Sequence, residues 1–393
     1  MTRPRLLALV LAGGAGSRMG VLTDDRAKPT LPFGATHRLI DFPLTNCRMS
    51  GIGDVWVIEQ HNPHSLIAHL ANGRPWDLDR TLGGFRILHP FTDDDSEQWH
   101  EGNAHAIHAH ADFIRECDPT HVLVLSADHV YTFDFRDLLD THEASGVGLT
   151  VVTTEVDGDA SRYGVVQVDG GKVKGFAYKP DEPTGSTVTT EVFLYGTATL
   201  LDGLDAVADE HGEEEMGDFG EHLLPTLVDA GEVGAHPLPG YWRDVGTIEA
   251  YWQGHADLLG AAPVLDLHDP SWPILGRLQY RPASRLLAGA VVEDAVVAPG
   301  AVVEGSVVRS VIGPGVHVGP GATIVDSVVM DDVTVEAGAT VRRSIVADGA
   351  RIDREADVGS ELVSGDDGGI TVVAAGARVP TGAAVTGEVS GRA

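Results

Sequence analysis

The chain has 393 residues, of which 43% are hydrophobic and 22% charged, and this balance is typical of a globular protein long enough for two domains. A formal net charge of −31 argues against nucleic acid and anionic membrane surfaces as partners. Cys47 and Cys117 are too few and too scattered for a disulfide framework or a zinc site.

The first apolar run, Leu6–Leu11, passes directly into a glycine-rich loop without a convincing cleavage site. It therefore predicts a buried strand rather than a signal peptide, and a cytoplasmic protein. The further predicted strands are Val55–Ile58, Phe85–Leu88, His121–Ser126, Gly148–Thr153 and Val165–Val168, with a helix over Asn103–Glu116. This alternation predicts a doubly wound α/β domain with a mostly parallel, Rossmann-like sheet over residues 1–260. Such sheets bind ligands beyond the carboxyl ends of their strands.

The composition changes after residue 260. Residues 261–285 are rich in proline and predict a connecting arm, and residues 286–393 repeat apolar β-branched positions at a period of six residues. The repeating positions are Val291, Val297, Val303, then Ile312, Val318, Ile324, then Val329, Val335, Val341, then Val346, Ile352, Val358. That period predicts a left-handed parallel β-helix that serves as scaffold and as the interface of a homo-oligomer, a dimer or tetramer. A six-residue-repeat acyltransferase is the alternative.

The loop after the first strand, residues 12–20, reads Ala-Gly-Gly-Ala-Gly-Ser-Arg-Met-Gly. Glycines let backbone N–H groups approach phosphate oxygens, which makes the loop a candidate phosphate cradle. It lacks the P-loop pattern, and Met19 stands where the dinucleotide pattern requires its third glycine. By itself the loop could be a simple tight turn, but it contains Arg18, and Lys28 and Arg38 follow it closely.

Together with Ala127–Tyr131, Ser161–Val165, Lys179-Pro180 and Tyr241–Thr247, these segments resemble the bacterial ADP-glucose pyrophosphorylases, in order and over nearly the whole chain. The resemblance implies an enzyme that joins a sugar-type 1-phosphate to a nucleoside triphosphate, with Mg²⁺, and releases pyrophosphate. Because both substrates are anions, catalysis would consist mostly of alignment and charge neutralisation.

The resemblance also implies the role of each site residue. Asp128, after the predicted strand His121–Ser126, and Asp244 would hold Mg²⁺, although a helix cap is the usual role of a lone Asp after a strand. Arg18, Lys28 and Asp128 would be catalytic, and Lys179 would hold the acceptor phosphate. The implied nucleotide site is Ala12, Gly13, Gly14, Gly16, Ser17, Arg18, Lys28, Gly102, Asn103, Ala127 and Asp128, and the acceptor site is Gly164, Tyr178, Lys179, Thr189, Glu191, Arg243 and Asp244. Arg243 would contact phosphate or orient Asp244.

The sequence departs from this family around the acceptor. Tyr178 stands where the family has a Glu that binds glucose hydroxyls, and Glu191 stands where it has a Gly that the sugar approaches. A pocket built for one hydroxyl pattern discriminates strongly, so we expect another acceptor, such as the C7-cyclitol valienol 1-phosphate. The alternative is that these positions have drifted in sequence within an ordinary enzyme that makes ADP-glucose.

Two further departures concern the base and regulation. The family's adenine-reading Gln residues have no counterpart at residues 92–95. Asp93 or Asp94 in this segment would accept hydrogen bonds from guanine, so the sequence slightly favours GTP over ATP as the nucleotide substrate. Thr36 replaces an activator-binding Lys, which predicts weak or absent activation by fructose phosphates. A catalytically silent regulatory subunit is a further alternative, against which the retained charged residues argue.

Overall fold

The computed structural model describes residues 5–14, 16–59, 62–81, 83–89, 102–359 and 369–390. The chain divides into two compact units, Met1–Gly14 with Phe42–Trp242 and Ala15–Asp41 with Arg243–Ala393. Among the described residues, no helix has both the length and the apolar character needed to cross a membrane.

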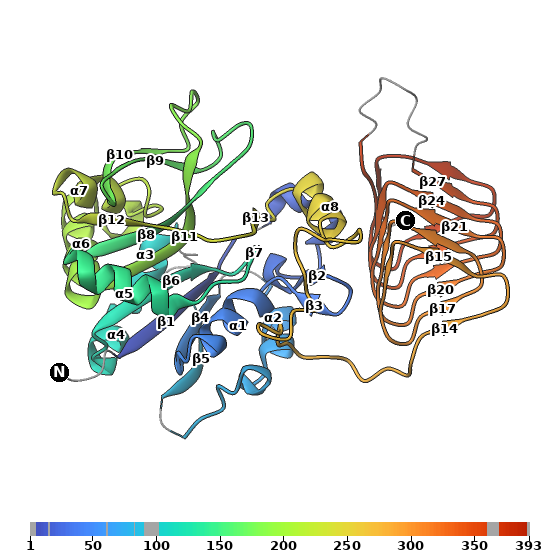
Figure 1. The fold of residues 1–393 in the computed structure, drawn as a ribbon, viewed down its shortest axis with the longest axis horizontal. Helices are drawn as coiled ribbons and strands as arrows, with labels where there is room; N and C mark the ends of the chain where they lie inside the picture. Colours follow the sequence, from blue (N-terminus) through green and yellow to red (C-terminus); the bar gives the residue numbers. More distant parts are fainter. Residues whose placement is uncertain are drawn as a thin grey trace. The chain divides into compact units, whose positions relative to one another are not determined.

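The first unit is built on a nine-stranded sheet with the strand order β5-β4-β1-β6-β11-β8-β12-β10-β9 (Figure 1). Its strands are β1 Leu6–Ala12, β4 Asp54–Glu59, β5 Gly84–Leu88, β6 His121–Ser126, β8 Leu149–Glu155, β9 Gly164–Asp169, β10 Lys172–Tyr178, β11 Thr187–Gly196 and β12 Val233–Pro237. The half from β5 to β6 is parallel, whereas β11 runs antiparallel to both β6 and β8. Each strand predicted for this part of the chain is present, and the α/β fold class is confirmed.

Helices connect these strands. They are α1 Asp41–Met49, α2 Pro63–Leu70, η3 Arg74–Trp76, α3 Asn103–His108, α4 Ala111–Cys117, α5 Phe135–Ser145, α6 Thr197–His211, η4 Glu213–Glu215 and α7 Leu223–Asp229, with the short strand β7 at His129–Tyr131. The longer helices bury apolar side chains, such as Leu138 of α5 and Leu204 of α6. The core between layers includes Leu9, Val124 and Tyr195, each at most 1% exposed.

The helix predicted over Asn103–Glu116 is two helices. The N–H of His110 donates to the carbonyl of Ile107, three residues back, at 3.0 Å. The end of α3 is thus tightened into a 3₁₀ turn, and His110 has the non-helical angles φ −109 and ψ 11 before α4 begins. The apolar face of the sequence pattern is continuous across this break, which is why periodicity alone did not reveal it.

The second unit contains a left-handed β-helix of three parallel six-stranded sheets (Figure 1). The first sheet holds β14 Arg285–Leu286, β17 Val302–Val303, β20 His317–Val318, β23 Thr334–Val335, β26 Arg351–Ile352 and β29 Arg378–Val379. The second holds β15 Val291–Glu293, β18 Ser306–Val308, β21 Thr323–Val325, β24 Thr340–Arg342, β27 Asp357–Val358 and β30 Ala384–Val385. The third holds β16 Val296–Val297, β19 Val311–Ile312, β22 Val328–Val329, β25 Ser344–Val346, β28 Thr371–Val373 and β31 Glu388–Val389.

The six-residue period identifies the interior of this β-helix. From Val303 to Val358 the repeating Val and Ile side chains are at most 1% exposed and form one core. Val291 is the exception, because it is 54% exposed and pairs with Ser306, while its neighbour Val292 packs against the core. The inward position of that strand is therefore one residue later than predicted, which matches a five-residue slip before Val297.

The remaining elements of the second unit come from two separate parts of the chain. They are η1 Ser17–Leu22, η2 Lys28–Thr30, β2 Pro32–Phe33, β3 His37–Arg38 and α8 Ile248–Ala256, preceded by β13 Trp242–Asp244 at the boundary of the two units. Helix α8 is joined to the β-helix by a 2.8 Å hydrogen bond from Trp252 Nε1 to the carbonyl of Asp326. The arm at residues 261–284 contains neither helix nor strand.

Candidate active site

Asp128 lies just beyond the carboxyl end of β6, where an α/β sheet places its ligands. Its carboxylate accepts a hydrogen bond from the Ser126 hydroxyl, and the side chain is 22% exposed. The next residue, His129, is 4% exposed, and its Nδ1 lies 3.0 Å from the carbonyl oxygen of Thr190. Because a carbonyl only accepts, Nδ1 carries the proton and Nε2 points the other way.

The Nε2 atom of His129 faces two carboxylates. It lies 3.7 Å from Asp128 Oδ1 and 3.8 Å from Glu191 Oε2. One ligand-type atom from each of the three residues lies within 4.8 Å of the others, an arrangement that can hold a metal ion. The sequence analysis expected Asp128 to bind metal and Glu191 to contact the acceptor, and did not single out His129.

Glu191 occupies an irregular stretch of β11, where the register with β8 shifts between Thr189 and Phe193. Its φ is +55, and its side chain is 51% exposed. The left-handed region costs a residue with a Cβ roughly 1–2 kcal/mol, and glycine avoids this cost. The backbone thus has a conformation suited to glycine, while the side chain adds a carboxylate beside His129.

Residues predicted for the nucleotide site and for the acceptor site meet at Asp218. Its Oδ2 accepts from the hydroxyl of Tyr178 at 2.6 Å, and its Oδ1 accepts from the backbone N–H of Asn103 at 3.1 Å. The Nζ atom of Lys179 lies 2.5 Å from the Tyr178 hydroxyl and 3.8 Å from Asp218 Oδ2. Burial and the Asp218 carboxylate raise the pKa of Tyr178, so the hydroxyl stays protonated. Sequence reasoning missed Asp218, whose signal was its place between two turn-forming glycines, 217 and 220.

The ring of Tyr178 fills the space next to Lys179. A Cβ at Gly220 would overlap this ring, so only glycine leaves room for it. Lys179 Nζ lies 4.4 Å from the ring centroid, and Tyr178 pairs across the sheet with Gly164. Thr189, another predicted acceptor residue, is 5% exposed on β11. The structure therefore brings Tyr178, Lys179 and Gly164 together around one side of the strand ends.

The glycine-rich loop continues directly from β1. Gly16 has φ +66, and a Cβ there would lie 3.0 Å from Thr23 Cγ2 and 3.3 Å from Lys28 Cβ. Gly16 and Lys28 are therefore packed together in the second unit, with the Lys28 residue 7% exposed. Arg18 and Ser17 are exposed, as expected for groups that meet a ligand. Ala12 lies at the end of β1, before Gly13 and Gly14, and the N–H of Ala127 donates to the carbonyl of Leu11 at 3.1 Å.

Arg243 and Asp244 belong to the second unit. The guanidinium of Arg243 contacts Asp257 Oδ2 through Nε at 2.9 Å and Nη2 at 2.6 Å, and the Asp244 carboxylate lies over Gly246. This ion pair gives Arg243 a structural role, and its contact with a substrate stays a prediction. Asp128 belongs to the first unit, so a metal ion shared with Asp244 also stays a prediction.

A family model for "Nucleotidyl transferase" matches residues 7–260, and one for "GlmU-like, C-terminal hexapeptide" matches residues 285–379. A glucose-1-phosphate adenylyltransferase of Clostridium botulinum is 39% identical over 327 residues, which cover 82% of this chain and 84% of that relative. Another, of Acetivibrio thermocellus, is 38% identical over 328 residues, covering 83% of this chain and 76% of the relative. The chain belongs to the nucleotidyl transferase family. The prediction of a sugar-phosphate nucleotidyltransferase is thereby confirmed.

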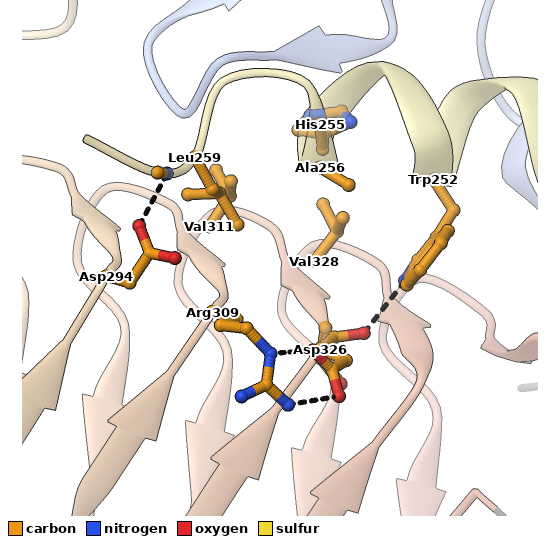
Figure 2. A pocket seen from close by; sticks show the side chains of 11 residues that line it. Trp252, His255, Ala256, Leu259, Asp294, Arg309, Val311, Asp326 and Val328 are labelled. Atoms are coloured by element: carbon orange, nitrogen blue, oxygen red, sulfur yellow. Dashed lines mark hydrogen bonds and ion pairs between the residues drawn. The ribbon is translucent and has the colours of Figure 1, made fainter. Parts of the chain in front are cut away.

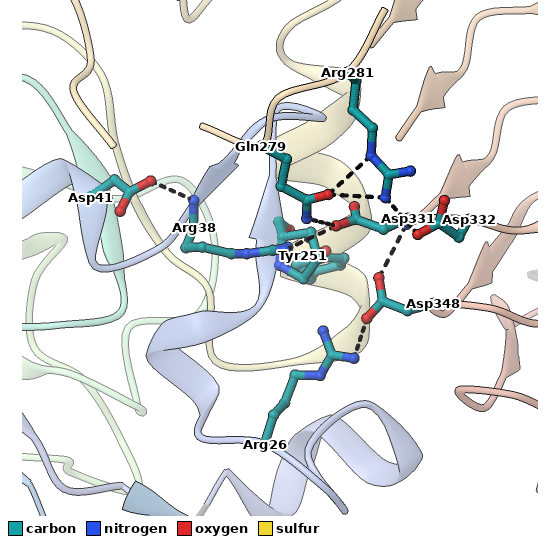
Figure 3. Close-up of polar contacts among 10 residues, drawn as sticks. Arg26, Arg38, Asp41, Tyr251, Gln279, Arg281, Asp331, Asp332 and Asp348 are labelled. Carbon is teal, nitrogen blue, oxygen red and sulfur yellow. Dashed lines mark hydrogen bonds and ion pairs between the residues drawn. The ribbon is translucent and has the colours of Figure 1, made fainter. Parts of the chain in front are cut away.

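In this nucleotidyl transferase, two arginines of residues 15–41 are held by carboxylates of the β-helix (Figure 3). Arg38 Nη2 lies 3.0 Å from Asp331 Oδ2, and Arg26 is paired with Asp348. Gln279 Nε2 donates to the same Asp331 oxygen at 2.9 Å. An anionic effector would have to displace these carboxylates to reach the arginines.

A separate cavity of about 210 Å³ lies in the second unit of the nucleotidyl transferase, between α8 and the β-helix (Figure 2). Trp252, His255 and Leu259 line it from one side, and Arg309 and Asp326 form a two-contact ion pair on the other, at 2.6 and 2.8 Å. Its described lining includes none of the predicted site residues. The predicted base-reading residues, Asp93 and Asp94, lie outside the described part of the chain.

Proposed function

We propose that this enzyme transfers AMP from ATP to glucose 1-phosphate in the presence of Mg²⁺, which yields ADP-glucose and pyrophosphate. The observation that carries the proposal is the 39% identity, over 82% of the chain, to a protein named glucose-1-phosphate adenylyltransferase. The described Lys28, Lys179 and Asp128 support it: the two lysines supply positive charge for a reaction between two anions, and Asp128 supplies a carboxylate for the metal ion.

In the proposed reaction, a phosphate oxygen of the acceptor attacks the α-phosphorus of the nucleotide. A new P–O bond forms as the bond to the β-phosphate oxygen breaks, and pyrophosphate leaves with the electron pair. Arg18 and Lys28 would neutralise the triphosphate, and Lys179 would place the acceptor phosphate. Asp128, oriented by Ser126, fits a divalent cation because Mg²⁺ prefers carboxylate oxygens, and with Asp244 it would hold that ion. When bound, Mg²⁺ neutralises charge that develops on the phosphates.

The hydrogen bonds around Lys179 support its role as a fixed cation. The Tyr178 hydroxyl donates its proton to Asp218, so its oxygen accepts from the Lys179 ammonium. The chain from lysine to tyrosine to carboxylate restrains a flexible side chain that is 47% exposed. A restrained ammonium loses less entropy on binding phosphate than a freely rotating one.

A second candidate reaction differs in its acceptor and its base. By the resemblance, Tyr178 occupies the place of the family's hydroxyl-binding Glu. Its own hydroxyl donates a hydrogen bond to Asp218. Glu191 adds a charge where the family has none. These two changes favour an acceptor with a different hydroxyl pattern, such as valienol 1-phosphate, and the second candidate takes GTP as its donor.

A pyrophosphate-release panel separates the candidates. It crosses ATP and GTP with glucose, mannose, N-acetylglucosamine and valienol 1-phosphates, and compares kcat/KM for each pair. We expect ATP with glucose 1-phosphate to be the best pair. A preference of about tenfold or more for valienol 1-phosphate, worth ~1.4 kcal/mol, would instead establish the second candidate. Absence of release with every pair would reject both and indicate a silent regulatory subunit.

The setting of the reaction is part of the same proposal. We infer a cytoplasmic enzyme, where nucleoside triphosphates and sugar phosphates are available, and a homo-oligomer, either dimer or tetramer. The exposed Leu286 and Val291 on the first coil of the β-helix, 59% and 54% exposed, support association at that coil. Light scattering on the purified full chain would give the mass of the assembly.

A further inference from the structure

We propose that Asp128, His129 and Glu191 form a site for a transition-type divalent cation such as Mn²⁺, with His129 Nε2 and one oxygen of each carboxylate as ligands. The inference rests on the proposed function, because Asp128 is also the residue expected to hold the Mg²⁺ of the reaction. It adds two ligands to that residue, so that the site accepts a transition-type ion as well as the Mg²⁺ of the reaction.

The spacing of the three groups suits a common ion. Ligand atoms at ~2.1 Å from a cation lie about 3.0–3.4 Å from one another in octahedral or tetrahedral geometry. His129 Nε2 lies 3.7 Å from Asp128 Oδ1 and 3.8 Å from Glu191 Oε2, beyond ordinary hydrogen-bond distance. A contraction of roughly half an ångström would bring His129 within the range for each carboxylate. The ligand atoms of all three residues lie within 4.8 Å of one another, and the half-exposed Glu191 side chain can rotate to bring its oxygen nearer to Asp128.

The imidazole is held in the orientation that a metal ligand requires. Its Nδ1–H donates to the carbonyl of Thr190 at 3.0 Å, and its ring meets the edge of Trp242 at 5.2 Å with an interplanar angle of 86°. A backbone acceptor on one ring nitrogen is the usual support of a histidine that binds metal through the other. Ser126 orients Asp128 in the same way.

The chemical type of the three ligand atoms determines which cations the site can bind. Two carboxylates and a neutral imidazole carry a net charge of −2, which a divalent cation neutralises. Mg²⁺ prefers oxygen-only surroundings, whereas Mn²⁺, Co²⁺ and Zn²⁺ accept an imidazole nitrogen beside carboxylates. The set therefore favours a transition-type ion over Mg²⁺.

The test is a titration of the full chain with Mn²⁺, without nucleotide or Mg²⁺, followed by electron paramagnetic resonance of free and bound Mn²⁺. We expect one tight Mn²⁺ per chain, with ¹⁴N modulation from His129 in electron spin-echo spectra. E191G should weaken Mn²⁺ binding tenfold or more, and H129N should abolish the ¹⁴N signal. E143Q, which removes an exposed carboxylate from α5, is the matched control and should bind as the wild type does.

Two results would overturn the inference: equal Mn²⁺ affinity of wild type and E191G, or bound Mn²⁺ without ¹⁴N modulation. Misfolding does not obscure the comparison, since glycine suits the φ of +55 at position 191. Pyrophosphate release with Mg²⁺ separates the two proposals. Turnover without a Mn²⁺ site refutes only the inference, whereas a Mn²⁺ site without turnover for any substrate pair refutes only the proposed function.

Discussion

At the scale of single residues, Glu191 has a backbone conformation that glycine adopts at lower cost. Its φ of +55 carries a penalty of roughly 1–2 kcal/mol, partly offset by the larger chain entropy that glycine loses on folding. We predict that E191G raises the free energy of unfolding of the first unit by about 0.5–1 kcal/mol. Urea denaturation measures this, and a lower midpoint for E191G would show that the side chain itself stabilises the fold.

Lys179 is predicted to act on the acceptor rather than on folding. Because its Nζ is exposed and restrained by Tyr178, K179A should lower kcat/KM at least ~10²-fold, mainly through a higher KM for the sugar 1-phosphate. Y178F keeps the ring but removes one hydrogen bond, so we expect a loss of about tenfold. K174A, an exposed lysine on β10, is the control. Similar kinetics for K174A and K179A would contradict the assignment.

Residue types at strand ends were predictable, but their partners were not. The pattern of an apolar strand followed by Asp128, and the Lys179-Pro180 motif, were visible in the sequence. For Asp218 the sequence offers only its place between two glycines, and its partner was not predictable, because it lies 40 residues from Tyr178 in the chain and meets it only through the packing of β10 and the 217–220 turn. The same holds for Glu191, whose approach to His129 depends on the irregular register of β11.

At the scale of elements, the spacing of apolar residues predicted the strands better than it predicted where helices end. The strand His121–Ser126 and the inward positions of the β-helix follow from apolar residues alone. The break at His110 and the one-residue displacement at Val291 depend on local hydrogen bonding and on a slip in the repeat. The break leaves the apolar face of the sequence continuous, and two successive valines, Val291 and Val292, leave the position of the slip open in the sequence.

Helix α8 contains a buried histidine whose protonation opposes folding. The Nδ1 of His255 donates to the carbonyl of Tyr251 at 2.9 Å, and its Nε2 accepts from the N–H of Gly34 at 3.3 Å. Burial lowers the pKa of His255 from 6.5 to about 4, so the folded state binds its proton less readily than the unfolded state. Its contribution to stability is therefore full above pH 6.5 and is lost as the pH falls towards 4.

We predict that, as the pH falls from 8 to 5, protonation of this histidine in the unfolded state lowers the free energy of unfolding by about 2 kcal/mol. H255Q removes the titrating group, so its thermal midpoint should fall less than that of the wild type over the same pH interval. H268Q, which changes an exposed histidine of the connecting arm, should show the wild-type pH dependence. An unchanged pH dependence in H255Q would refute the argument.

At the scale of the whole molecule, the second unit combines residues 15–41 with the C-terminal part of the chain. Arg38 and Arg26 are already paired with Asp331 and Asp348, and the resemblance to the ADP-glucose pyrophosphorylases implies that Thr36 stands in place of an activator-binding Lys. We therefore predict that fructose 6-phosphate and fructose 1,6-bisphosphate change kcat/KM by less than about twofold, ~0.4 kcal/mol. An increase of about tenfold in the same pyrophosphate assay would contradict this, since it requires a coupling of ~1.4 kcal/mol.

The net charge of −31 makes the local basic groups decisive for binding two anionic substrates. The central claim is that metal held at Asp128 allows those anions to react. D128N is nearly isosteric and removes the charge, and D137N, on α5, is the matched control. We expect D128N to reduce kcat/KM for pyrophosphate release at least ~10²-fold while D137N leaves it unchanged. A D128N enzyme within about twofold of the wild type would contradict the account.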